Sequence, residues 1–117
     1  HTLLVNTLLT DRQTLKEKLK TKRYDVENSI FVPHGLYINK VSGLIESSEY
    51  QNGYFDILSE SSQIVPFVLS PKKGERILDL CAGRGGKTIH MAMMMENIGE
   101  IVAIDIDKYK IENLKKM

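Results

Sequence analysis

Apolar and polar positions near the start of the chain change from strand-like to helix-like spacing. Residues 3–5 form a short apolar run that predicts a strand. Thr10 with Gln13 three residues later has the form of a capping box, and apolar residues four positions apart follow it. We therefore expect a helix over about 11–21 that Thr10 caps.

The next apolar runs are short and are separated by turn residues. Two extended segments, 30–32 and 36–38, flank a Pro-His-Gly turn. Residues 43–50 are weakly helical, and an Asn-Gly turn at 52–53 leads into a strand-like run over 54–58. The order strand, helix, strand, short helix, strand predicts a small α+β layer structure.

A helix and a loop follow this first region. Ser59 or Ser61 can cap a helix that runs to Leu69, and Pro66 is expected to kink it. The Ser-Pro-Lys-Lys-Gly stretch at 70–74 has the composition of a loop.

The last third of the chain has the clearest pattern. A strand over 76–80 has apolar residues on both faces, as a buried parallel strand requires. A glycine-rich turn at 82–86 leads into a helix over 87–96, which we expect Gly99 to cap. A second apolar strand over 100–104, an acidic residue and an amphipathic helix complete the pattern. This order is typical of the start of a doubly wound α/β sheet.

Composition excludes several classes of protein. The chain has 117 residues, of which 42% are hydrophobic and 26% charged, so it has the composition of one globular domain and not of a disordered or coiled-coil chain. The longest apolar run falls far below the roughly 18 residues of a membrane span, so we expect no membrane partner. Cys81 is the single cysteine, which excludes an internal disulfide and predicts a reducing, cytoplasmic setting.

Charge is distributed unevenly along the chain. Residues 11–23 hold six Lys or Arg against two acids, residues 24–70 one against six, and residues 71–117 nine against seven. The net charge of +1 is not the footprint of a nucleic-acid-binding protein, but the first block is locally basic. That block fits either a solvated helix face or a phosphate-contacting one.

The glycine turn and the acid after the second strand together predict a nucleoside-containing ligand. A strand that delivers a glycine turn onto a helix N-terminus presents backbone N–H groups and the positive end of a helix dipole. Gly83, Gly85 and Gly86 let a ligand approach the backbone closely. Asp105 lies 22 residues beyond Gly83, near the spacing of about 20 residues expected for a carboxylate that binds ribose hydroxyls.

Three ligand classes compete for this site. A phosphate-binding loop would need a glycine where Cys81 stands, and a dinucleotide fingerprint would need one where Thr88 stands. S-adenosylmethionine carries no phosphate and needs only the glycine bend and the ribose acid. It fits without exception.

The run Leu78-Asp79-Leu80-Cys81-Ala82-Gly83-Arg84-Gly85-Gly86-Lys87-Thr88 closely resembles the first methyltransferase motif of the Sun (Fmu-type) family of RNA cytosine-5 methyltransferases. The resemblance extends to residues 5–8, 53–55, 60–63 and 102–107. Among family members, the chain looks most like the bacterial small-subunit ribosomal RNA enzymes.

The resemblance implies roles for individual residues. Asp105 would hold the ribose hydroxyls of S-adenosylmethionine. The leading region would be an RRM-like module facing RNA, with ribosomal RNA expected as partner before transfer RNA. The residues expected to wrap the methionine portion of the cofactor are Cys81, Ala82, Gly83, Arg84, Gly85, Gly86 and Lys87.

The chain departs from the family pattern in its glycine turn. Family members usually have Ala-Pro where this chain has Gly83-Arg84, and the loss of proline frees the φ angle of the turn. Arg84 is then expected either to pair with the carboxylate of the cofactor or to lie in solvent.

No catalytic residue is expected within the chain. In the family, one cysteine attacks C6 of cytosine and a second assists release, and both lie downstream of the second strand, beyond Met117. Cys81 is not one of them, so we expect a fragment that ends before the catalytic cysteines and is inactive alone. No grouping of His, Cys and Asp has the spacing of metal ligands, so no metal is expected.

The sequence thus predicts an α/β protein in two parts. Residues 1–58 would form the small α+β, RRM-like region, and residues 59–117 the first β-α-β-α of a Rossmann-like methyltransferase domain. A non-catalytic RNA-binding or assembly module is the main alternative, and a nucleotide-binding ATPase fragment is a weaker one. An exposed sheet edge would favour self-association.

Overall fold

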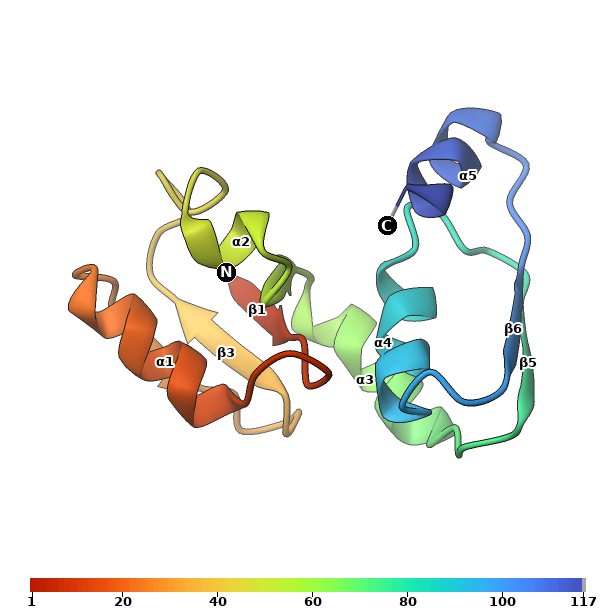
Figure 1. Cartoon of the computed structure of the whole chain (residues 1–117), viewed down its shortest axis with the longest axis horizontal. Helices are drawn as coiled ribbons and strands as arrows, with labels where there is room; N and C mark the ends of the chain where they lie inside the picture. The colour runs from red at the N-terminus through yellow and green to blue at the C-terminus, as the bar shows by residue number, and fades with distance from the viewer. Residues whose placement is uncertain (117) are drawn as a thin grey trace. The chain divides into compact units, whose positions relative to one another are not determined.

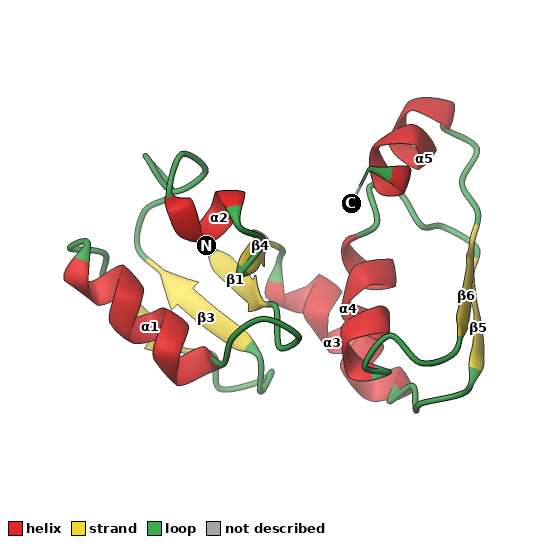
Figure 2. Cartoon of the chain, viewed as in Figure 1, coloured by secondary structure: helices red, strands yellow, loops and turns green. Residues whose placement is uncertain are grey.

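The apolar runs of the first 64 residues pair into an antiparallel sheet. The computed structural model describes residues 1–116 and divides the chain between Ile64 and Val65 into two units. In the first unit the strands lie in the order β2-β3-β1-β4, with every neighbouring pair antiparallel (Figures 1 and 2). Its elements are β1 (Thr2–Val5), α1 (Arg12–Thr21), β2 (Val26–Asn28), β3 (Gly35–Ile38), α2 (Ser48–Gln51) and β4 (Phe55–Ile57).

Helix α1 packs on this sheet and completes its core. Leu15 and Leu19, four residues apart on α1, are fully buried together with Leu3 of β1 and Leu36 of β3. Phe55 of β4 closes the same cluster. The strand at the start of the chain, the helix after it and the strand after the Asn-Gly turn confirm three of the predicted elements.

The cap of α1 is Asp11 and not Thr10. The Asp11 carboxylate accepts hydrogen bonds from the Thr14 amide at 2.9 Å and from the Thr14 hydroxyl at 2.7 Å. A carboxylate at this position satisfies a free amide of the first turn and faces the positive end of the helix dipole. The expected Thr10 capping box was wrong by one residue.

Residues 30–32 form a loop, although their branched and aromatic side chains predicted a strand. The Ser29 hydroxyl accepts hydrogen bonds from the amides of Phe31 and Val32, both at 3.2 Å, which removes these donors from a sheet ladder. The strand that pairs with β3 lies earlier, at Val26–Asn28, and the sequence analysis missed it.

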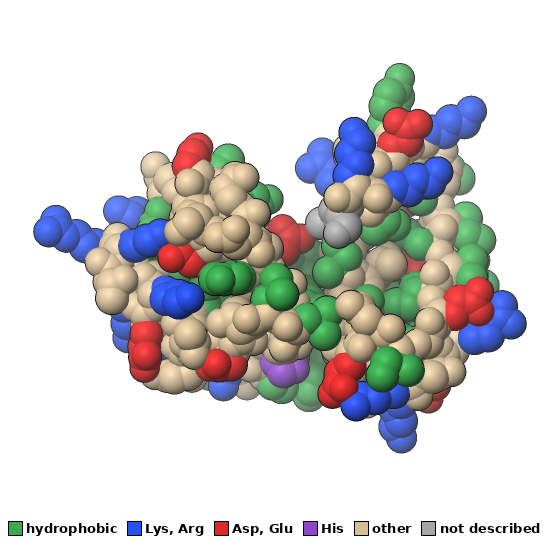
Figure 3. Space-filling model, in the orientation of Figure 1, with side chains coloured by type: hydrophobic (Ala, Val, Ile, Leu, Met, Phe, Trp, Pro, Cys, Tyr) green, Lys and Arg blue, Asp and Glu red, His purple; other side chains and the backbone are tan. Residues whose placement is uncertain are grey.

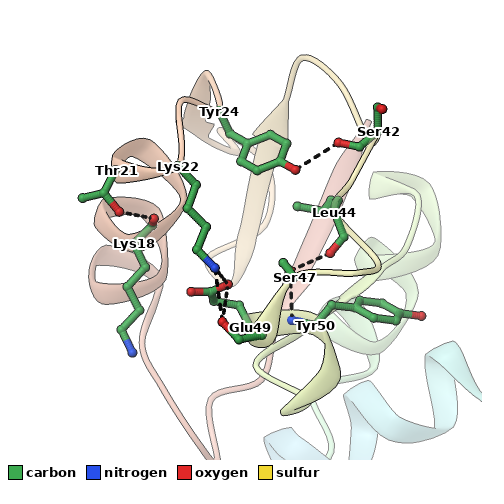
Figure 4. A network of polar contacts seen from close by, with 10 residues as sticks. Lys18, Thr21, Lys22, Tyr24, Ser42, Leu44, Ser47, Glu49 and Tyr50 are labelled. Carbon is green, nitrogen blue, oxygen red and sulfur yellow. Dashed lines mark hydrogen bonds and ion pairs between the residues drawn. The ribbon is translucent and has the colours of Figure 1, made fainter.

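A polar network connects α1 to α2 in the first unit (Figure 4). Lys22 pairs with the carboxylate of Glu49, whose side chain is buried, and the Lys22 ammonium also donates to the Ser48 hydroxyl at 3.2 Å. Burial raises the pKa of Glu49, but the bond and charge of Lys22, together with bonds from the Glu49 backbone and Ser48, outweigh this effect, so the pKa lies below its ordinary value. The Ser47 hydroxyl caps α2 by accepting a bond from the Tyr50 amide.

The remaining lysines of α1 also face groups of the first unit. Lys16 and Lys20 approach Glu27 at 3.4 and 4.0 Å, and the Lys18 ammonium lies 4.9 Å from the centre of the Tyr54 ring. Figure 3 shows acidic side chains among the basic ones over this helix. Much of the basic block therefore has partners within its own unit.

The second unit is built on two parallel strands. Ile77 pairs with Ile101 and Asp79 with Ala103, and α4 connects the two strands. Met91 and Met93 of α4 and Met95 after it are buried in the core of this unit. The elements here are α3 (Glu60–Leu69, which begins before the division and contains Pro66), β5 (Arg76–Asp79), α4 (Gly86–Met94), β6 (Glu100–Ala103) and α5 (Lys108–Lys115).

Gly99 does not cap α4. The helix ends at Met94, and Glu96 and Asn97 adopt the left-handed conformation after it. Gly99 instead lies against the backbone of Glu75, where a Cβ would come within 2.6 Å of the carbonyl oxygen. The absence of a side chain at Gly99 allows the backbone to pass close to Glu75 where β6 begins beside β5.

One side of the β5–β6 ladder is apolar and exposed. Leu78 and Leu80 from the first strand and its extension, and Val102 and Ile104 from the second, all keep at least 40% of their surface accessible. Among the described residues, no helix combines the length and apolar character that crossing a membrane requires.

Candidate cofactor site

The site begins where β5 ends, at Asp79. The Asp79 carboxylate accepts a hydrogen bond from the Thr88 hydroxyl at 2.7 Å and one from the Cys81 amide at 3.3 Å. Asp79 therefore fixes the end of the strand to the first turn of α4.

The loop between β5 and α4 is also fixed to the end of β6. The Ile104 amide donates to the Asp79 carbonyl oxygen at 2.8 Å, and the Ala82 amide donates to the Ile104 carbonyl oxygen at 3.0 Å. The Gly85 amide then donates to the Ala82 carbonyl oxygen at 2.9 Å, which closes a tight turn with Gly83 and Arg84 at its tip.

Two glycines meet distinct requirements in this turn. Gly83 has φ of +56° with open space where a Cβ would stand. Gly85 has φ of +94°, and a Cβ there would lie 2.2 Å from Cδ1 of Leu114 on α5. Gly85 thus needs both a left-handed backbone and the absence of a side chain, because α5 packs directly on it.

Asp105 lies against the glycine turn. One carboxylate oxygen accepts from the Gly83 amide at 2.8 Å and the other from the Asp107 amide at 2.9 Å. These two bonds, that from Asp107 first and that from Gly83 second, lower the pKa of Asp105, so the group is an anion at neutral pH. Asp107 in turn caps α5 by accepting from the amides of Tyr109 and Lys110.

The N-terminus of α4 presents free donors beside this anion. The cap residue Gly85 has no side chain, and within residues 1–116 no group accepts a hydrogen bond from the amides of Gly86, Lys87 or Thr88. These amides and the helix dipole favour a negatively charged group. The site therefore offers a carboxylate on one side and a helix end that favours an anion on the other.

The structure brings the predicted residues together in one loop. Ala82 and Gly85 are buried, Gly83, Gly86 and Lys87 are half-buried, and Cys81 and Arg84 are exposed. The sequence pattern did not identify Thr88, which stood there only as a mismatch to a dinucleotide fingerprint, or Leu114 of α5. The sequence signal that could have identified Thr88 is a hydroxyl group in the first turn of the helix that follows the strand ending at Asp79.

A hollow lies near the loop but not in it. A cavity of about 200 Å³ between α4 and β6 is lined by apolar residues such as Ala92, Met95 and Ile101, and Thr88 alone is shared with the loop region. The glycine turn itself is an open surface. In the part of the chain that the structure describes, no cluster of three His, Cys, Asp or Glu side chains could hold a metal ion.

Comparisons with known proteins place this loop in a family. The family model described as 16S rRNA methyltransferase RsmB/F matches residues 66–117. The probable ribosomal RNA small subunit methyltransferase B of Bacillus subtilis (strain 168) is 34% identical over 116 residues, covering 98% of this chain and 26% of that protein. The tRNA (cytosine(72)-C(5))-methyltransferase of Pyrococcus horikoshii is 39% identical over 82 residues, covering 67% of this chain and 21% of that protein.

Solved structures agree with these relatives. The methyltransferase homolog protein from Pyrococcus horikoshii has a TM-score of 0.91 at 29% identity and covers 98% of this chain and 38% of its own. NSun6 from Pyrococcus horikoshii, solved with SFG, has a TM-score of 0.88 at 20% identity, which shows the fold; it covers 99% of this chain and 53% of its own. The chain spans about a quarter of the Bacillus relative. Over that span it belongs to the RsmB/F family of RNA cytosine-5 methyltransferases.

Proposed function

We propose that this chain supplies the S-adenosylmethionine-binding part of a ribosomal RNA cytosine-5 methyltransferase. The observation that carries the proposal is the hydrogen bond between Asp105 and Gly83, because it joins an anionic carboxylate to the glycine turn across 22 residues of sequence. The family uses S-adenosylmethionine, and the Bacillus subtilis relative is named for the small-subunit ribosomal RNA.

The residues present fit such a cofactor. Asp105 would accept hydrogen bonds from the ribose hydroxyls, and the loop from Cys81 to Lys87 would surround the methionine portion. Ile106, next to the acid, is fully exposed and would offer apolar surface to the adenine ring. S-adenosylmethionine, when bound, supplies a methyl group on a positively charged sulfur.

We infer that the chain does not transfer the methyl group by itself. Cys81 is exposed but lies in the cofactor loop, where its amide is bonded to Asp79. A nucleophile for cytosine has to reach the base, and we assign that role to residues outside this chain. The expected result is cofactor binding without turnover.

We propose that the first unit contacts RNA. Its β-α-β-β-α-β order and its strand order are those of an RRM-like module. Several α1 lysines face Glu27 and Glu49, so Arg23 and Lys40, which make no ion pair among the described residues, are the better candidates for phosphate contacts.

Calorimetric titration of S-adenosylmethionine tests the cofactor proposal. Saturable binding that Asp105→Asn weakens at least tenfold would support it, because the variant loses the charge on the carboxylate. Glu112→Ala is the matched control, since Glu112 is exposed on α5 and its replacement removes the same charge. Absence of binding by the unaltered chain, or competition by ATP in place of S-adenosylmethionine, would contradict the proposal.

The exposed apolar ladder supports a separate proposal of self-association. Leu78 and Val102 face solvent on adjoining strands, and such surfaces favour pairing. Light scattering on a size-exclusion column should then show a mass above that of one chain, and Leu78→Lys should lower it. A single-chain mass over the full concentration range would contradict this expectation.

A further inference from the structure

Arg84 at the tip of the glycine turn has no polar partner among the residues that the structure describes. Its side chain is exposed, and no ion pair or hydrogen bond is formed by its guanidinium. The other arginine of the second unit, Arg76, is also exposed but pairs with Glu100 across the strand ladder. Arg84 is therefore a cationic side chain on an ordered turn that has no acidic partner within residues 1–116.

The acids nearest in the fold are already engaged. Asp105 accepts from two amides, and Asp79 accepts from a hydroxyl and an amide. Lys87, three residues further on, likewise makes no ion pair within residues 1–116 and stands in the first turn of α4. The turn and the first turn of α4 thus carry two cationic side chains that form no ion pair, beside the free amides of a helix N-terminus.

Hydrogen bonds on both sides of Arg84 fix its backbone in the turn at residues 82–85. The Gly85 amide bonds to the Ala82 carbonyl oxygen at 2.9 Å and closes the turn, while the Gly83 amide is held by Asp105. Gly83 and Gly85, the two neighbours of Arg84, have positive φ angles and no side chains, so Arg84 carries the only side chain in this three-residue stretch, and it is exposed.

The charges of S-adenosylmethionine decide which part of it can meet this region. At neutral pH the cofactor carries a positive sulfonium, a positive ammonium and one negative carboxylate. The unpaired guanidinium of Arg84 repels the first two and attracts the third, and it can bind a carboxylate through two parallel hydrogen bonds.

We propose that Arg84 binds the carboxylate of the methionine portion of S-adenosylmethionine and so helps to select cofactors that carry it. This inference rests on the proposed cofactor function of the loop. Arg84 touches the cofactor away from the transferred methyl group, so its contribution is to affinity and to ligand selection.

Two ligands that differ by the carboxylate alone provide the test. Binding of S-adenosylmethionine and of decarboxylated S-adenosylmethionine is measured by calorimetry for the unaltered chain, for Arg84→Ala and for Arg84→Lys. Arg76→Ala is the matched control, because it removes an exposed arginine from the same unit. We expect Arg84→Ala to weaken S-adenosylmethionine about tenfold, a size typical of a partly solvated charge pair, and Arg84→Lys to restore part of that loss.

Arg84→Ala should bind the decarboxylated ligand at least as tightly as the unaltered chain does, because only a repulsion is removed, and this binding also shows that the loop remains folded. Equal losses for both ligands, an equal loss in Arg76→Ala, or unchanged S-adenosylmethionine binding in Arg84→Ala would each overturn the role of Arg84 while the cofactor proposal stands. If the unaltered chain binds neither ligand, the cofactor proposal fails and this inference fails with it.

Discussion

Replacing Gly85 by alanine should distinguish two reasons for glycine in the turn at residues 82–86: a left-handed backbone and the lack of space for a side chain. Gly85 has φ of +94°, and the methyl group of an alanine there would lie 2.2 Å from Cδ1 and 3.3 Å from Cγ of Leu114. Gly83, two residues earlier, has φ of +56° and no atom within 4 Å of the same position. The two substitutions therefore share a backbone cost and differ in a steric one.

The magnitudes follow from these contacts. A left-handed conformation costs an L-residue roughly 1–2 kcal/mol, and this applies to both positions. The contact with Leu114 adds about 1–3 kcal/mol for overpacking, toward the lower end because Cδ1 is the end of a side chain that can rotate. We expect Gly83→Ala to destabilise the turn by about 1–2 kcal/mol and Gly85→Ala by about 2–4 kcal/mol.

Native-state hydrogen exchange is the suitable assay because the chain has two units and one global unfolding free energy would mix them. The Ile89 amide donates to the Gly85 carbonyl oxygen at 2.8 Å and reports the opening of the first turn of α4. In the double variant Gly85→Ala/Leu114→Ala the steric contact is gone, so a coupling energy of about 1 kcal/mol or more should appear. Equal destabilisation by Gly83→Ala and Gly85→Ala, or no coupling energy with Leu114→Ala, would show that Leu114 does not restrict residue 85.

Three further predictions concern the first unit. Asp11→Ala should lower its stability by about 1 kcal/mol in urea denaturation, because the Thr14 amide loses its acceptor; no change would show that the cap is dispensable. The pKa of Glu49 lies below its ordinary value because Lys22, Ser48 and the Glu49 backbone together outweigh burial. The ionised side chain therefore stabilises the unit above the ordinary carboxyl pKa, and this contribution is lost as pH falls through the lowered pKa of the folded state. Glu49→Gln should flatten the loss of stability between these two pKa values, and an unchanged acid-unfolding profile would contradict this. Gly35→Ala should lower the melting temperature, because its Cβ would come within 2.5 Å of a loop side chain, which costs about 1–3 kcal/mol; an unshifted melt would show that the loop yields freely.

The elements of this fold that local signals specify were predicted, and those that pairing specifies were not. The helix after residue 11 and the parallel strands around the glycine turn follow from periodicity, turn residues and apolar runs. Strand β2 has a single buried residue, Val26, and two exposed polar ones, so nothing in its own composition marks it. It is a strand because it pairs with β3 at the sheet edge.

The candidate site was predicted as a set of residues but not as a geometry. The spacing between Gly83 and Asp105 indicated a carboxylate for ribose hydroxyls, and the structure adds a direct hydrogen bond of 2.8 Å between Asp105 and the Gly83 amide. The bond from Thr88 to Asp79 and the packing of Leu114 on Gly85 could not be inferred, because they depend on how the helices dock on the strands. A motif in the sequence specifies which groups are available, and docking decides which of them are used.

The conformation of the glycine turn is set by residues far along the chain. Within the turn itself, one bond closes it, from Gly85 to Ala82. The contacts that hold it in place come from Ile104, Asp105 and Leu114, all of which follow β6. The turn therefore has this shape only with the residues after β6 in place, and the same residues bring the Asp105 carboxylate beside the free donors at the start of α4. A ligand that bridges Asp105 and α4, as proposed for the cofactor, is expected to stabilise the pairing of β5 with β6.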